Sequence, residues 1–104
     1  MRWHQTDGFS LKDFNASVTF ATDYALTDDE KRPFINATAS AASKVLTLGL
    51  NPGDTCIVYN AGGTNAFTVK NISGDTGTSV AKGKAALCIG GTSTADTTVC
   101  VLLN

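Results

Sequence analysis

The residues best suited to chemistry in this chain begin with a short acidic run. Asp28, Asp29 and Glu30 are consecutive, and Asp23 precedes them. Consecutive carboxylates point in diverging directions, and the Asp-x-Asp-x-Asp-Gly spacing of a calcium loop is missing. Thr27 and Glu30 instead have the spacing of a capping box. We therefore predict a solvated turn with at most one turn of helix here, and no metal site.

The other candidates for catalysis are a single histidine and a glycine pair. His4 lies beside Trp3 near the N-terminus, outside any predicted rigid element. A catalytic base must be held by a third group on a rigid scaffold, which argues against a triad at His4. Gly62-Gly63 stands between two predicted strands, so it cannot cradle a phosphate at a helix start. We predict a protein that is not an enzyme and needs no cofactor.

Three cysteines, Cys56, Cys88 and Cys100, fall inside predicted strands. No Cys-x-x-Cys pair exists to form a zinc site. The N-terminus lacks the apolar region of a signal peptide, and no apolar run approaches the ~20 residues of a membrane span. We therefore expect a chain made in a cytoplasm without membrane contact, whose three thiols are unbridged and mostly buried.

The number and distribution of charged residues indicate which classes of partner to expect. The 104 residues carry a net charge of −1, and the eight basic residues are scattered from Arg2 to Lys84. Without a basic patch, nucleic acid is not an expected partner. Charged residues make up only 16% of the chain. A surface with so few charges is either covered by Thr and Asn or partly hidden in an assembly.

Short strands separated by turns dominate the chain after residue 16. Leu46, Leu48 and Leu50 alternate within the predicted strand 45–50, and Pro52-Gly53 follows as a turn. Further extended segments are predicted at 17–21, 32–38, 55–60, 66–72, 78–81, 85–89 and 97–104. This spacing indicates an all-β fold, a small antiparallel β-sandwich or barrel formed by residues 17–104 as one domain.

The predicted last strand, 97–104, is apolar on both faces. Its apolar residues divide into Val99, Val101 and Leu103 on one face and Cys100 and Leu102 on the other. A sheet of a small sandwich has one core side, so the second apolar face needs cover from elsewhere. We expect this strand to be central in the fold or buried between subunits, with Cys100 and Leu102 at the subunit interface.

Residues 1–16 are predicted to form an extended N-terminal arm. The large apolar residues of this arm fit neither a helix face nor a strand face, and they are Trp3, Phe9, Leu11 and Phe14. The arm either packs back on its own domain or anchors in a neighbouring protein through these residues, because aromatic side chains dominate interface energetics. Both interpretations are left open.

One set of segments carries a resemblance to a known class of module. The segments are Asp23-Tyr24-Ala25-Leu26-Thr27, Phe34-Ile35-Asn36-Ala37, Val45-Leu46-Thr47-Leu48, Pro52-Gly53-Asp54, Tyr59-Asn60-Ala61-Gly62-Gly63 and Phe67-Thr68-Val69. Together they resemble small β-modules of tailed-bacteriophage virions, which occur in capsid decoration (cement) proteins, head fibres and tail fibres. The resemblance implies a jelly-roll or β-tulip-like fold and a homotrimer. It supplies no catalytic residues.

The chain has no long shaft and no second module, which favours a decoration protein over a fibre. The expected function is that of a structural virion protein on the outer surface of the capsid, assembled in the host cytoplasm. It would bind and stabilise the shell of major capsid protein. The alternative is a receptor- or glycan-binding module of a head or tail fibre, in which Tyr24 or Tyr59 would stack on surface glycans.

Overall fold

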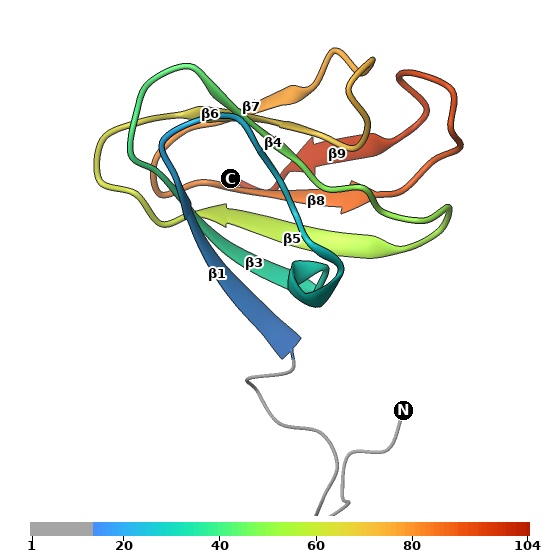
Figure 1. Cartoon of the computed structure of the whole chain (residues 1–104), viewed down its shortest axis with the longest axis horizontal. Coiled ribbons are helices and arrows are strands. Elements are labelled where there is room, and N and C mark those ends of the chain that lie inside the picture. The colour runs from blue at the N-terminus through green and yellow to red at the C-terminus, as the bar shows by residue number, and fades with distance from the viewer. Residues whose placement is uncertain (1–13) are drawn as a thin grey trace, which may run out of the picture.

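The computed structural model describes residues 14–104. They form two β-sheets that face each other (Figure 1). The elements in chain order are β1 (Asn15–Phe20), β2 (Tyr24–Ala25), the 3-10 turn η1 (Asp28–Glu30), β3 (Phe34–Ala39), β4 (Lys44–Thr47), β5 (Thr55–Asn60), β6 (Phe67–Lys70), β7 (Thr78–Val80), β8 (Ala85–Ile89) and β9 (Val99–Leu102). One sheet has five strands in the order β1-β3-β5-β8-β9, and the other has four in the order β2-β4-β6-β7. The all-β prediction is confirmed.

The predicted antiparallel arrangement is wrong for the first six strands. They alternate between the sheets, so that β1, β3 and β5 stack parallel in one and β2, β4 and β6 stack parallel in the other. Each connection between parallel neighbours is therefore a strand of the opposite sheet. Only the pairs β5–β8, β8–β9 and β6–β7 are antiparallel. The two open sheets do not close into a barrel.

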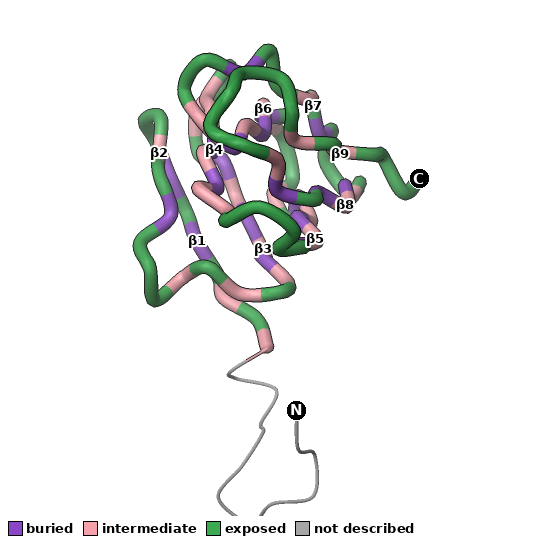
Figure 2. The backbone as a smooth tube through the Cα atoms, turned by 90° about the vertical axis from the view of Figure 1, so that its right-hand side faces the viewer, coloured by how far each residue is buried: buried purple, intermediate pink, exposed green. Residues whose placement is uncertain are grey.

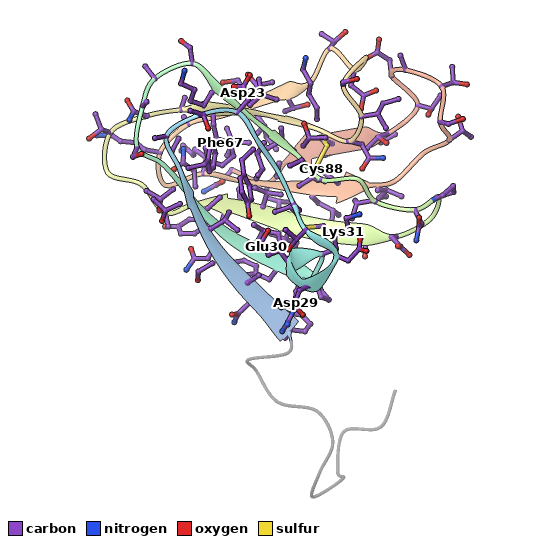
Figure 3. The ribbon with its side chains drawn as sticks, in the orientation of Figure 1. Asp23, Asp29, Glu30, Lys31, Phe67 and Cys88 are labelled. Atoms are coloured by element: carbon purple, nitrogen blue, oxygen red, sulfur yellow. A yellow bond between two sulfur atoms is a disulfide. The ribbon has the colours of Figure 1, made fainter. Side chains whose placement is uncertain are left out.

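The core lies between the sheets and follows the period-two alternation of strand side chains (Figure 2). Fully buried aliphatic residues such as Ile35, Leu46 and Val58 come from both sheets. Phe67 lies between the two layers (Figure 3) and packs edge-to-face on Phe20, with the ring centroids 5.5 Å apart. This arrangement leaves the opposite face of each sheet outside the core.

Buried polar side chains stabilise the loops by replacing missing backbone partners. Asn60 has no exposed surface, and its side chain amide donates to the carbonyls of Asn65 and Val80 at 2.9 Å each. The side chain of Asn71 both accepts from the Leu50 N–H at 2.6 Å and donates to the Leu50 carbonyl at 3.2 Å. Because these amides are hydrogen-bonded, burying them does not carry the full desolvation cost.

The prediction of three unbridged thiols is wrong for two of the cysteines. Cys88 and Cys100 form a disulfide between β8 and β9, and only Cys56 is unbridged and buried, as expected. The register pairs Cys88 directly with Cys100, with their Cα atoms 4.1 Å apart. Neighbouring strands bring side chains close together at such a position. The cysteines therefore no longer support the expected assembly in a reducing cytoplasm.

Candidate interaction surface

The face of the five-stranded sheet that points away from the core carries most of the large exposed apolar side chains of residues 14–104. We call it the outer face. Its positions alternate with core-facing neighbours along each strand, and these neighbours are buried throughout β3, β5 and β8. In β9 the core-facing residues are half-buried or exposed. The positions of the outer face are Asn15, Ser17, Thr19, Phe34, Asn36, Thr38, Thr55, Ile57, Tyr59, Ala85, Leu87, Ile89, Val99, Val101 and Leu103. None of these side chains carries a charge.

An unbroken apolar row crosses four strands of this face. The strand register aligns Phe34 with Ile57, Ile57 with Leu87, and Leu87 with Val101. Three inter-strand steps make the row about 14 Å long. Phe34 also stacks on Tyr59 from the next row, with ring centroids 6.4 Å apart. The aromatic pair and the row form one continuous apolar surface.

The β8–β9 end of the outer face is the most exposed part. Val99 is 55% exposed, Val101 54%, Leu103 51% and Ile89 43%. Covering these half-exposed aliphatic side chains would contribute roughly 3 to 6 kcal/mol. This stabilisation only matches the lower end of the free-energy cost of association, which is about 4 to 15 kcal/mol. Tight binding of a partner by this face would therefore also require contacts from the aromatic pair.

The outer face also carries polar side chains, mainly on β1 and β3, and one of them has a buried atom without a partner. The carboxamide oxygen of Asn36 is buried and has no hydrogen-bond partner among residues 14–104. Asn36 stands next to Tyr59 across β3 and β5. Leaving a buried acceptor without a hydrogen-bond partner has a free-energy cost.

Strand β9 is an edge strand, so the prediction of a central last strand is wrong. Cys100 lies on the core side in its disulfide, and Leu102 on the same side is 49% exposed. The Leu103 N–H donates to the Ala85 carbonyl of β8 at 2.8 Å. By the alternation of an antiparallel ladder, the backbone groups of Cys100 and Leu102 point to the open edge. Burial of this strand between subunits stays a prediction.

The predicted arm lies mostly outside the described residues. Trp3, Phe9 and Leu11 fall there, as does His4. Phe14 is half-buried directly before β1. Strand β1 begins at Asn15, two residues earlier than the predicted domain boundary.

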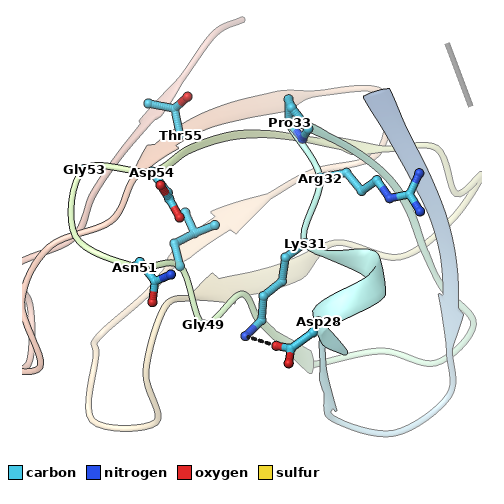
Figure 4. A pocket seen from close by; sticks show the side chains of 10 residues that line it. Asp28, Lys31, Arg32, Pro33, Gly49, Asn51, Gly53, Asp54 and Thr55 are labelled. Atoms are coloured by element: carbon cyan, nitrogen blue, oxygen red, sulfur yellow. Dashed lines mark ion pairs between the residues drawn. The ribbon is translucent and has the colours of Figure 1, made fainter. Parts of the chain in front are cut away.

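A polar cavity lies between η1 and the turn that joins β4 to β5 (Figure 4). It measures about 550 Å³, and Lys31, Arg32 and Asp54 are among its lining residues. The ammonium of Lys31 lies 3.1 Å from the carboxylate of Asp28, whose side chain is 99% exposed. Such exposed ion pairs are worth little. The cavity therefore offers mixed, solvated charges and no convergent binding group.

The predicted capping box at η1 is confirmed. The Thr27 N–H donates to the Glu30 carboxylate at 2.9 Å, and the Tyr24 hydroxyl donates to the same carboxylate at 2.7 Å. Burial alone would raise the pKa of Glu30, but these hydrogen bonds outweigh it and hold the pKa below its usual value. The hydrogen bond to Glu30 in turn raises the pKa of Tyr24. The acidic cluster thus has a structural role.

Both tyrosines named for glycan stacking are engaged within the chain. Tyr24 packs on Phe20 with ring centroids 6.3 Å apart, and its hydroxyl is bonded to Glu30. Tyr59 packs on Phe34. Both are half-buried, so each presents only part of its ring to a sugar.

Within residues 14–104, no group of His, Cys, Asp or Glu side chains is placed to hold a metal ion. The same part of the chain contains no helix that is long and apolar enough to cross a membrane. The thiol of Cys56 is buried, which raises its pKa to about 12 and disfavours the reactive thiolate.

Comparison of the chain with protein-family models, curated proteins and solved structures finds no match. The surfaces described above are therefore interpreted from their own geometry. Val99, Val101 and Leu103 were predicted from the sequence to share one face of the last strand, but their alignment with Phe34, Ile57 and Leu87 was not predicted. The available signal was that the segments 55–60 and 99–103 are apolar on both faces.

Proposed function

We propose that this chain is a structural protein of a tailed-bacteriophage virion that decorates the capsid and stabilises the shell of major capsid protein. It acts as a homotrimer on the outer surface of the capsid and performs no catalysis. The observation that carries the proposal is the uncharged outer face, with its apolar row from Phe34 to Val101 and the open edge of β9 beside it. A surface of this kind is typical of a chain that works within an assembly.

The mechanism is stabilisation by mass action. A protein that binds the expanded shell but not its precursor stabilises the expanded form by RT ln(1 + [L]/Kd). Several weak contacts made by one oligomer add their effects, because later contacts form at a high effective concentration. Modest affinity at each contact is then sufficient.

The N-terminal arm is the proposed capsid anchor. Its aromatic residues Trp3, Phe9 and Phe14, with Leu11, would insert between neighbouring capsid subunits. Strand β1, which follows the arm, is the edge of the five-stranded sheet opposite β9. The strand that follows the arm and the exposed aliphatic residues of β9 therefore lie at opposite edges of this sheet. The arm can then bind the capsid shell while β9 contacts a further chain.

Co-sedimentation with empty capsids tests the function. The capsids are assembled from the major capsid protein encoded with this chain and are prepared in precursor and expanded forms. We expect saturable binding to expanded capsids and at least tenfold weaker binding to precursors. The expanded shell should also withstand higher temperature when the protein is bound. Equal or absent binding to both forms would refute the decoration role.

The same protein applied to a panel of immobilised bacterial surface glycans separates the alternative. Saturable glycan binding without capsid stabilisation would assign the chain to a receptor-binding fibre module. Substituting Tyr59 with Leu should then weaken glycan binding.

A further inference from the structure

We propose that the outer face of the five-stranded sheet is the surface on which a second copy of this chain docks. The contact is centred on the row Phe34, Ile57, Leu87 and Val101. This inference rests on the homo-oligomer of the proposed function and assigns it a surface.

The two outward-pointing sheet faces differ in a way that selects this one. The four-stranded sheet directs mostly small or polar side chains outward, namely Ala25, Thr47, Thr68, Lys70 and Ser79, and Val45 is its one larger apolar residue. Such a surface needs no cover. The outer face carries the aromatic pair and the exposed aliphatic residues instead. Aromatic anchors surrounded by aliphatic residues are the usual composition of an interface centre.

The absence of charge on the outer face favours a second copy of the chain as the partner. Interfaces between different proteins usually match opposite charges, which select the partner and its orientation. The outer face has no charge for a foreign protein to match. Two copies of an uncharged face can meet without burying an unpaired charge, which would be strongly unfavourable. In a trimer each contact joins two different surfaces of neighbouring copies, and an uncharged face can accept another uncharged surface of the same chain.

The open edge of β9 supports the same partner. Natural edge strands are commonly blunted by charged residues, by proline or by a bulge. Strand β9 and the flanking residues 97–104 contain no charged side chain and no proline. An exposed edge of this kind is protected when an identical chain covers it, and symmetric self-association is the commonest form of assembly.

Sedimentation velocity of the full chain, without capsids, tests the proposal. The protein is compared with Val101→Asp over a range from about 1 µM to about 300 µM. Val101 is 54% exposed on an edge strand, so the variant should fold normally. Ser79→Asp is the matched control, because Ser79 is an exposed outward position on the other sheet and the charge change is the same. Circular dichroism checks the fold of both variants.

We expect the parent chain and Ser79→Asp to assemble equally. Val101→Asp should raise the dissociation constant by roughly 30-fold or more, because a carboxylate would be buried at the centre of the contact. Val99→Lys, which introduces the opposite charge at a neighbouring exposed position, should weaken assembly as well. It serves as the second variant if Val101→Asp does not fold.

Two results would overturn the proposal. The first is an assembly that Val101→Asp and Val99→Lys leave unchanged. The second is a parent chain that stays monomeric over the whole concentration range. If that monomer also shows a shift of Trp3 fluorescence in Val101→Asp, the N-terminal segment of the same chain occupies the face. A monomer that still stabilises capsids would refute this inference and the homotrimer but not the decoration role, and an assembly that ignores capsids would refute the decoration role alone.

Discussion

At the scale of single residues, buried amide and carboxylate side chains determine how the loops close. Asn60 is the central case. Its side-chain oxygen accepts from the Gly62 N–H at 3.0 Å, and its side-chain nitrogen donates to the carbonyls of Asn65 and Val80. One side chain therefore joins the end of β5, the loop after it and the end of β7. Leucine has a similar branched shape but could satisfy none of these groups.

Substituting Asn60 with Ala should lower the free energy of unfolding by about 2 to 5 kcal/mol, because buried backbone groups lose their partners and a cavity forms. Urea unfolding followed by circular dichroism measures the change. Asn15→Ala is the control, since Asn15 is exposed at the start of β1 and should shift stability by less than about 0.5 kcal/mol. Equal effects of the two variants would contradict this role for Asn60.

Asp75 performs a similar role with a charge. Its carboxylate accepts from the backbone N–H groups of Asn71 at 3.0 Å, Ile72 at 3.1 Å and Asp96 at 2.7 Å. Partial burial alone would raise the pKa of Asp75, but the hydrogen bonds outweigh it and hold the pKa below its usual value, with help from Lys70. The carboxylate clamps the loop after β6 to the loop after β8.

This depressed pKa predicts a loss of stability in acid. The contribution of Asp75 is fully present above the unfolded pKa of about 3.9 and is lost as the pH falls through the lower folded pKa. Asp75→Asn should destabilise the fold at neutral pH by about 1 to 3 kcal/mol. Its unfolding free energy should also decline less between about pH 5 and pH 2. Urea titrations at several pH values test this, with exposed Asp54→Asn expected to follow the parent chain.

At the scale of elements, the disulfide fixes the least buried strand. Strand β9 contacts the rest of the described chain mainly through β8, and Cys88–Cys100 links the two. The bridge encloses a short segment, with a sequence separation of 12. Closing a loop of this size stabilises a fold by about 3 kcal/mol in the chain-entropy description. The bridge thereby holds the exposed apolar residues of β9 in place.

Thiol counting by mass spectrometry tests the bridge. After unfolding without a reductant, we expect one alkylated cysteine per chain, Cys56, and three after unfolding with a reductant. In the folded protein Cys56 should resist alkylation, because it is only 1% exposed and burial raises its pKa to about 12. Three labels without a reductant would show that Cys88 and Cys100 are not joined.

Sequence reasoning predicted the strands better than their pairing. The strands 55–60 and 85–89 were predicted with their observed bounds, because period-two apolar patterns and turn residues mark them locally. Pairing depends on contacts between distant segments. Asn15 lies beside Phe34, and Phe34 beside Ile57. No local signal separates a strand that turns back in its own sheet from one that crosses to the other sheet.

The same limit explains what was missed in the candidate surface. Phe34 was placed in an extended segment, but its neighbours on the outer face are set by the register with β5. The disulfide was missed for a similar reason, since only the β8–β9 register places Cys88 opposite Cys100. The odd number of cysteines and the expected cytoplasm had predicted unbridged thiols. The pairing of β8 with β9 overturned that prediction.

At the scale of the whole molecule, the nature of the self-contact predicts its response to salt. An assembly formed by uncharged apolar faces gains little from electrostatic attraction, so screening should not weaken it. Its dissociation constant should change less than about threefold between about 0.05 M and 0.5 M NaCl, and sodium sulfate should tighten it. Sedimentation at each salt concentration measures this. A steep loss of assembly in NaCl would point to a charged interface elsewhere on the chain.

The last prediction separates folding from binding. Every member of the buried hydrophobic cluster lies between Val18 and Cys88, and the pairing of β1 with β3 starts at Asn15. Deleting residues 1–13 should therefore leave the unfolding free energy within about 0.5 kcal/mol of the parent value. If the arm anchors the chain, affinity for expanded capsids should fall at least tenfold. Circular dichroism, urea unfolding and capsid co-sedimentation give the three readings.

Deleting residues 1–16 provides the matched comparison. It also removes Phe14, Asn15 and Ala16, of which Asn15 and Ala16 pair with Phe34 and Ile35 of β3. This longer deletion should cost about 1 to 3 kcal/mol through lost strand pairing and through lost packing of Ala16 against the core. If the shorter deletion already unfolds the domain, the N-terminal segment is part of the core. If it folds and binds capsids as tightly as the parent chain, the anchor lies within residues 14–104.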